Sequence, residues 1–277
     1  MSAPDIWEEI VACRRRGEPA ALATIVSTLG STPGKDPMKM LVRADGTFVG
    51  SVGGGCLEAE VWEHAKAVMA NHRSMTVEFS LTEEDYPDSG LICGGKVTVF
   101  IEPVTSPTLH VFGAGHVGLA TSRLAREAGF RVVLHDDRDD MLEPERVGEG
   151  VLTVAGAYEA ALQAAAPGPA AHVVVMTRGH HDDQRVLQAL WDAGSRPRFL
   201  GMLGSASKRK ILLGRLAEAG VAQDWLEAIH TPVGLSIGAR TAAEIAVSVV
   251  AQLIGEVRGA STREARRAAL TPPATRQ

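Results

Sequence analysis

The sequence predicts an α/β protein in which an N-terminal α/β sandwich domain is followed by a Rossmann-like domain with a doubly wound parallel sheet. Three observations lead to this fold class. Residues 108–137 read as strand, glycine-rich turn, helix and second strand. Short apolar strands and helical patterns keep alternating after that unit, whereas residues 20–103 contain about five β-runs. We therefore expect domains at 1–105 and 106–257 and a mobile tail at 258–277.

The glycine turn of the second domain has the spacing of a dinucleotide-binding motif. The apolar strand 109–112 runs into the segment GAGHVG, in which Gly113 permits the tight turn and Gly115 lets a diphosphate approach the backbone. Gly118 then lets the helix pack closely on the sheet. The second strand ends at Asp136, 136 − 113 = 23 residues after the first glycine, where a carboxylate can contact ribose hydroxyls. An alternative is a turn whose glycines serve packing alone.

The first domain is expected to contain an N-terminal helix, several strands and a second helix. An amphipathic helix over residues 4–16 places Cys13 in the core. The β-runs cover residues 20–28, 39–43, 47–52, 74–81 and 97–103, and the second helix covers residues 57–70.

Two of the three cysteines stand in glycine-rich loops. Cys56 follows Gly53, Gly54 and Gly55 at the start of a helix, where the dipole and free N–H groups favour an anion. Cys93 precedes two further glycines, and its separation from the first thiol, 93 − 56 = 37 residues, allows the two to meet. The alternative for Cys56 is a small buried side chain in a tight turn.

In the second domain, polar side chains follow two of the buried strands along the chain. The run 172–177 leads to His180 and Asp183 at the edge where open parallel sheets present ligands. Equally, Asp182 or Asp183 can cap the helix that follows while the histidines are merely exposed.

The strand 198–203 leads to Gly204, Ser205 and Lys208 at the head of a helix. Glycine, hydroxyl, cation and helix N-terminus together predict a phosphate cradle. Later, residues 230–235 read as a turn before a long helix at 240–257, whose apolar face is either core or a dimer seam.

Composition narrows the class of protein. The 277 residues are 45% hydrophobic and 22% charged, with a net charge of −5, which does not favour nucleic acid as a partner. The N-terminus lacks the pattern of a signal peptide, and no apolar run is long enough for a membrane span. An odd number of cysteines argues for reduced thiols. We expect a cytoplasmic protein.

The motifs together resemble the XdhC/CoxI family of xanthine dehydrogenase accessory proteins. The resemblance runs from about residue 20 to residue 257. It is carried in order by GSTP at 30–33, KMLV at 39–42, GGGCLE at 53–58, CGG at 93–95, GAGHVG at 113–118, TRGHHDD at 177–183, GMLGSASK at 201–208 and PVGL at 232–235.

The resemblance implies an accessory factor, more than an enzyme, that binds molybdenum cofactor, supports its sulfuration and delivers it to a molybdenum hydroxylase. The partners would be that apoenzyme and a cysteine desulfurase, and a homodimer is expected. Cys56 and Cys93 would be molybdenum ligands or persulfide carriers, because molybdenum cofactor requires a soft ligand. The glycine turns at Gly53–Gly55, Gly113–Gly118 and Gly204 would supply N–H groups for its phosphate or a nucleotide.

Two other functions fit parts of the sequence. An NAD(P)-dependent oxidoreductase would use the second glycine turn and Asp136 for the dinucleotide, with His180 and Asp183 as an acid/base pair. An interaction protein would have a Rossmann domain that is structural and holds no ligand.

Overall fold

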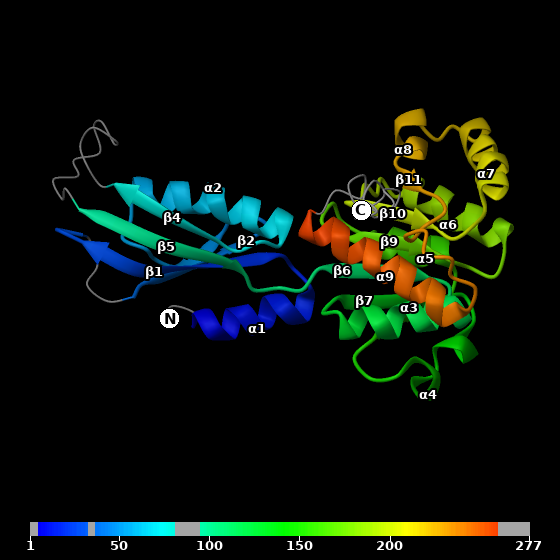
Figure 1. The fold of residues 1–277 in the computed structure, drawn as a ribbon, viewed down its shortest axis with the longest axis horizontal. Helices are drawn as coiled ribbons and strands as arrows, with labels where there is room; N and C mark the ends of the chain where they lie inside the picture. The colour runs from blue at the N-terminus through cyan, green and yellow to red at the C-terminus, as the bar shows by residue number, and fades with distance from the viewer. Residues whose placement is uncertain (1–4, 33–36, 81–94, 260–277) are drawn as a thin grey trace, which may run out of the picture. The chain divides into compact units, whose positions relative to one another are not determined.

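A computed structural model describes residues 5–32, 37–80 and 95–259, apart from the side chains of residues 206 and 207. The chain divides into two compact units, Met1–Ser106 and Pro107–Gln277, called here the N-terminal and C-terminal units (Figure 1). Each has its own sheet and its own hydrophobic clusters, and each is described separately.

The N-terminal unit is a five-stranded antiparallel sheet with one helix on each face (Figure 1). Its spatial order is β3-β2-β1-β5-β4. The strands are β1 (Ala20–Leu29), β2 (Lys39–Arg43), β3 (Phe48–Gly50), β4 (Met75–Ser80) and β5 (Lys96–Pro103), and the helices are α1 (Ile6–Arg16) and α2 (Cys56–Asn71).

Alternation along β1 explains why two helices are needed. Ala21 and Ala23 belong to the cluster under α2, whereas Ala20 and Leu22 belong to the cluster under α1. Successive side chains of a strand point to opposite faces, so a strand that begins with four successive apolar residues must be covered on both faces there. Cys13 is fully buried under α1, which confirms its prediction as a core residue.

The C-terminal unit is a six-stranded parallel sheet with the order β11-β10-β9-β6-β7-β8. Its strands are β6 (Thr108–Phe112), β7 (Arg131–Asp136), β8 (Leu152–Ala155), β9 (His172–Val175), β10 (Phe199–Met202) and β11 (Ile229–His230). Counted from β6, the described strands follow the order 3-2-1-4-5-6 of a dinucleotide-binding domain. The predicted fold class is confirmed.

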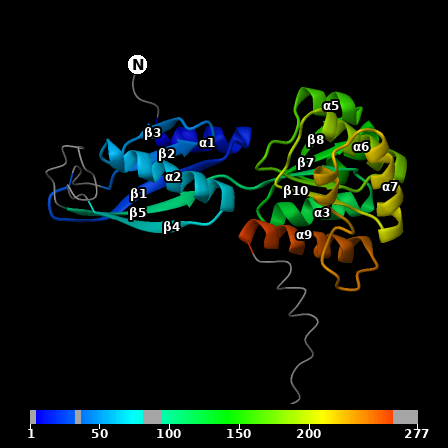
Figure 2. The same cartoon turned by 90° about the horizontal axis from the view of Figure 1, so that it is seen from above.

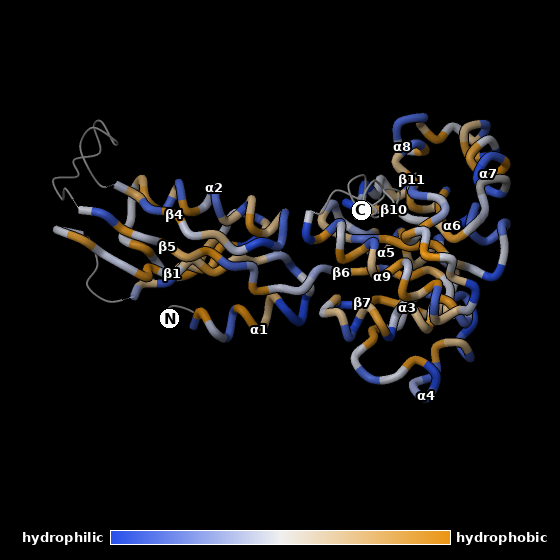
Figure 3. Tube along the Cα trace, viewed as in Figure 1, coloured by the Kyte–Doolittle hydropathy of each residue, from blue (hydrophilic) through white to orange (hydrophobic). Residues whose placement is uncertain are grey.

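Helices cover both faces of this sheet. Figure 2 shows α3 (His116–Glu127) and α9 (Ala242–Arg258) on one face, and α5 (Tyr158–Ala164), α6 (His180–Asp192) and α7 (Ala206–Glu218) on the other. Figure 3 shows apolar segments along the strands between them. Shorter helical segments are η1 (Asp139–Leu142), α4 (Pro144–Val147) and α8 (Gln223–Glu227). None of the described helices is long and apolar enough to span a membrane.

Three details differ from the expectation or refine it. The segment expected as a turn at 230–235 begins with the last residue of β11, which pairs with β10 and is too short to show a periodic pattern. Helix α9 is mainly core: Val249 is fully buried, whereas Val247 and Ile254 are 50% and 41% exposed. The N-cap of α6 is Gly179, so Asp182 and Asp183 lie in its first turn and neither aspartate is the N-cap.

The doubly wound order places its topological switch point between β6 and β9 in the C-terminal unit. The chain leaves β6 in one direction and β9 in the other, so the loops after these two strands separate at the carboxyl edge of the sheet. Those loops are Gly113–Gly115 and Met176–Gly179.

Candidate functional site

The turn before α2 requires glycine for its backbone conformation. Gly53, Gly54 and Gly55 have φ of 122°, 88° and 63°, a region that side-chain-bearing residues rarely adopt. A Cβ at Gly54 or Gly55 would meet no described atom within 4 Å. Glycine is therefore needed there for conformation, and the space next to the turn is open.

Glu58 holds this turn in place, a role that was not predicted. Its Oε1 accepts a hydrogen bond from Ser51 Oγ at 2.6 Å and another from the Gly54 N–H at 3.2 Å. It is the third residue of α2, the position from which a carboxylate reaches back to the start of a helix. That spacing in GGGCLE was the signal that could have identified it.

Cys56 is the first residue of α2, and its side chain is exposed. The preceding N-cap, Gly55, has no side chain with which to accept from the first-turn N–H groups. An exposed thiol thus stands beside N–H groups that a bound anion can use. Cys93 lies outside the described residues, so its proximity to Cys56 stays a prediction. The described residues contain no group of three or more His, Cys, Asp or Glu side chains that could hold a metal ion.

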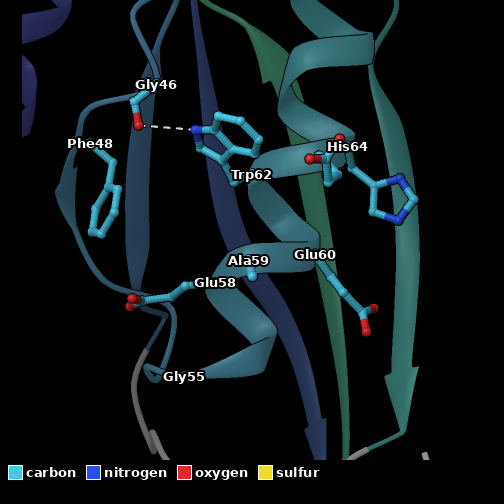
Figure 4. A pocket seen from close by; sticks show the side chains of 9 residues that line it. Gly46, Phe48, Gly55, Glu58, Ala59, Glu60, Trp62 and His64 are labelled. Atoms are coloured by element: carbon cyan, nitrogen blue, oxygen red, sulfur yellow. Dashed lines mark hydrogen bonds between the residues drawn. The ribbon is translucent and has the colours of Figure 1, made fainter. Parts of the chain in front are cut away.

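A groove of about 720 Å³ adjoins the glycine turn (Figure 4). It is lined by Gly46, Phe48, Gly55, Glu58, Ala59, Glu60, Trp62, Glu63 and His64. Trp62 is held in place, because its Nε1 donates to Gly46 O at 3.0 Å and Lys66 Nζ lies 3.7 Å from the centre of its ring. The groove has the volume of a small-molecule site.

The glycines of the second turn differ in what surrounds them. Gly113 has φ 110°, and a Cβ there would lie 2.5 Å from Met176 O. A Cβ at Gly118 would overlap the carbonyl oxygen of Gly113. At Gly115, by contrast, a Cβ would meet no described atom within 4 Å, so space is open at the N-terminus of α3.

Asp136 is placed at the end of β7, as expected, but its carboxylate is already bonded. It is 1% exposed and accepts from the Ala114 N–H at 2.7 Å. Arg138 donates to both of its oxygens through Nε and Nη2, at 2.9 and 3.1 Å. A ribose at this position would have to compete with these bonds. The neighbouring carboxylate of Asp137 is more accessible, at 18% exposure.

Asp183 is likewise committed to partners within the unit. Its Oδ1 accepts from Thr177 Oγ1 at 2.6 Å and its Oδ2 from Lys208 Nζ at 2.5 Å. His180 is exposed and borders a separate cavity of about 280 Å³ between α6 and α7. The structure therefore joins Asp183 to Thr177 and Lys208, and the expected acid/base pairing with His180 is not what its hydrogen bonds show.

The residues expected to form a phosphate cradle lie together at the start of α7. Ser205 is the N-cap of α7, and its Oγ accepts from the Lys208 N–H at 3.3 Å. The Lys208 ammonium is bonded to Asp183 and so is not free for a phosphate. Gly204 lies against the Lys208 side chain, since a Cβ there would be 3.0 Å from its Cδ.

An ion-pair network that was not predicted crosses from the loop after β7 to the loop after β9. Arg178 donates to Asp137 at 3.0 Å and to Asp182 at 2.8 Å. Arg185 joins Asp182 to Glu159 of α5. Burial would raise the pKa of Asp182, but the hydrogen bonds from the two arginines outweigh it and hold that pKa below its usual value. The network spans residues 41 positions apart, which sequence spacing does not reveal.

Two models of known protein families match the sequence of this chain. Residues 13–80 match the model of the XdhC and CoxI family, and residues 109–253 match the model of the XdhC Rossmann domain. The chain belongs to the XdhC/CoxI family. The predicted family is confirmed, and both the Cys56 turn and the Gly113 turn lie within the matched ranges.

Three relatives are similar to most of this chain. It is 33% identical over 252 residues to the uncharacterized protein YqeB of Escherichia coli, covering 90% of this chain but only 46% of YqeB, so it spans about half of that relative. It is 28% identical to the molybdenum cofactor insertion chaperone PaoD of Escherichia coli, covering 86% of this chain and 83% of PaoD. It is 24% identical to a probable xanthine dehydrogenase component of Bacillus subtilis, covering 86% of this chain and 93% of that protein.

Proposed function

We propose that this chain is an accessory protein for the maturation of a molybdenum hydroxylase. It binds molybdenum cofactor and delivers the cofactor to the apoenzyme. Membership of the XdhC/CoxI family supports the accessory role, and one relative carries the name of a molybdenum cofactor insertion chaperone. The observation that carries the cofactor part is the exposed Cys56 at a helix start that follows three glycines.

The residues present fit that cofactor chemically. A thiolate is the soft ligand that molybdenum or a transferable sulfur requires, and Cys56 is accessible for that purpose. The first-turn N–H groups of α2 suit the negative charge of the phosphate. Cys56 binds the metal or carries a persulfide, and Cys93 is proposed as a second thiol. A cysteine desulfurase is the proposed sulfur donor.

Substitution of each thiol tests this proposal. We expect Cys56→Ser to retain less molybdenum after purification and to activate the client apoenzyme less well than the parent, with the same comparison made for Cys93→Ser. Cys13→Ala is the matched control, because that thiol is fully buried under α1. Unchanged cofactor binding and unchanged activation in both serine variants would remove the thiols from the proposal.

A second candidate function is NAD(P)-dependent oxidoreduction in the C-terminal unit. It is favoured by the strand order and by the open space above Gly115 at the start of α3. Titration of the protein into NADH, followed by nicotinamide fluorescence, tests it. Saturable binding that is lost in Gly115→Val supports a dinucleotide site, and an unchanged spectrum excludes it.

A further inference from the structure

We propose that the groove beside α2 is the subsite for the pterin ring of the cofactor, with the carboxylates of Glu60 and Glu63 accepting from the N–H groups of its aminopyrimidine edge. This inference rests on the proposed cofactor-binding function and adds to it a location and a mode of recognition. The residues concerned lie in the N-terminal unit alone.

The spacing along α2 aligns the thiol with the carboxylates. Cys56, Ala59, Glu60 and Glu63 stand at positions i, i+3, i+4 and i+7, which share one face of a helix. Seven residues of α-helix rise about 10 Å, which is comparable to the length of a three-ring heterocycle. A molecule whose reactive end contacts Cys56 therefore reaches Glu60 and Glu63 with its far end.

The walls of the groove suit a flat aromatic ring. Figure 4 shows Phe48 and Glu58 on the hairpin side of α2 and Glu60 and His64 on the other side, with the small side chain of Ala59 between them. Phe48 is 48% exposed, a large apolar side chain that a planar ligand would cover. Trp62 also lines the groove and is held by its bond to Gly46 O.

The two ends of the cofactor differ in charge, and α2 offers each end a different kind of group. Its phosphate and dithiolene are anionic and suit the N-terminus of α2, where the helix dipole is positive. Its aminopyrimidine edge carries N–H donors in a row, which two oxygens of a carboxylate can accept together. Glu63 pairs with Lys66 at 2.8 Å, but the two side chains are 64% and 45% exposed, so a ligand can replace that bond at little cost.

Ligand discrimination tests the recognition mode directly. The probes are 6-hydroxymethylpterin and 6-hydroxymethyllumazine, which has an oxo group in place of the 2-amino group and so presents an acceptor, instead of a second donor, beside the ring N3–H. Binding is measured from the fluorescence of each heterocycle. We expect the parent protein to bind the pterin on the order of tenfold more tightly than the lumazine, as one charged hydrogen bond contributes.

Substitution of each glutamate by glutamine, which removes the charge and keeps the size, tests which carboxylates accept the hydrogen bonds. An amide presents one acceptor and one donor, so Glu60→Gln or Glu63→Gln should weaken pterin binding about tenfold and reduce the preference over lumazine. Glu8→Gln is the matched control, because it removes an exposed carboxylate from the first turn of α1. In a Cys93→Ser background, bound pterin should also slow alkylation of Cys56.

The outcomes separate this inference from the proposed function. Equal binding of the two probes, or a pterin affinity that neither groove variant changes, would overturn the subsite. If the intact molybdenum cofactor still copurifies in that case, the chaperone function stands and only the location is wrong. If neither the pterin nor the intact cofactor binds, both proposals fail.

Discussion

Asp136 is a structural carboxylate whose removal should destabilise the C-terminal unit. In Asp136→Asn the amide presents an N–H₂ group to Arg138, so one side of the bidentate pair becomes repulsive in a site that is 1% exposed. We expect a loss of about 2 kcal/mol, measured by urea unfolding. Asp137→Asn breaks a pair with the half-exposed Arg178 and should cost less than about 1 kcal/mol. The opposite order would contradict this assignment.

Two glycines of the same turn should respond differently to alanine. Gly118→Ala places a Cβ on the Gly113 carbonyl oxygen, and this overlap should cost about 3 kcal/mol, more than the roughly 1 kcal/mol that alanine gains in a helix. Gly115→Ala meets open space at φ −71° and should leave the melting temperature unchanged. Thermal unfolding of both variants measures whether each glycine is required for packing.

Residue types and spacing located the site residues better than they predicted their partners. The distance between Gly113 and Asp136 correctly placed a carboxylate at the end of β7. It did not reveal that Ala114 and Arg138 occupy it, because those bonds depend on how two loops meet in space. Glu58 differs, because its bonds are local and its position in the first turn of α2 was visible in the sequence.

The pairing of β6 with β7 brings two neutral histidines together. His110 Nδ1 and His135 Nε2 lie 3.1 Å apart, and the His135 ring stacks on Phe112. Burial lowers the pKa of His110 to about 4, with a smaller contribution from the charge of Arg131. Burial also lowers the pKa of His135 to about 3. The Nδ1 atom of His135 has no hydrogen-bond partner among the described residues.

These two histidines should make the C-terminal unit sensitive to acid. Below about pH 6.5 the unfolded chain binds protons that the folded chain refuses, so the free energy of unfolding should be largest above that pH and fall as the pH drops towards about 4. His135→Phe removes one titrating group and should flatten this fall in urea unfolding between about pH 7 and pH 4.5. His181→Gln is the control: this histidine is exposed, so its substitution should leave the fall in the free energy of unfolding unchanged. An equal slope in both variants would contradict the account.

Elements with a clear period were predictable, whereas the two-residue strand β11 was not. The strand predicted at 39–43 is found at Lys39–Arg43, and the helix predicted at 57–70 is found at Cys56–Asn71. Their boundaries follow from local turn signals and from alternation along the chain. The two-residue strand β11 exists only because β10 supplies a neighbour to pair with.

Each unit has its own core, and each should unfold in response to its own mutations. Ile101→Ala empties space in the cluster under α2, and Leu187→Ala empties space under α6. Both side chains are fully buried, so we expect losses of about 2–5 kcal/mol. Hydrogen exchange should accelerate only in the unit that carries the substitution. Faster exchange in both units from either substitution would indicate a single cooperative unit.

The accessory function is tested most directly by what the purified chain carries. The protein is co-expressed with an active molybdenum cofactor pathway, and molybdenum is measured by metal analysis alongside the fluorescence of the oxidised pterin. If the chain binds molybdenum cofactor, the purified parent protein should carry molybdenum and pterin in near-equal amounts. The Cys56→Ser variant should carry less of both. Protein that carries neither species, under conditions in which the client enzyme acquires its cofactor, would contradict it.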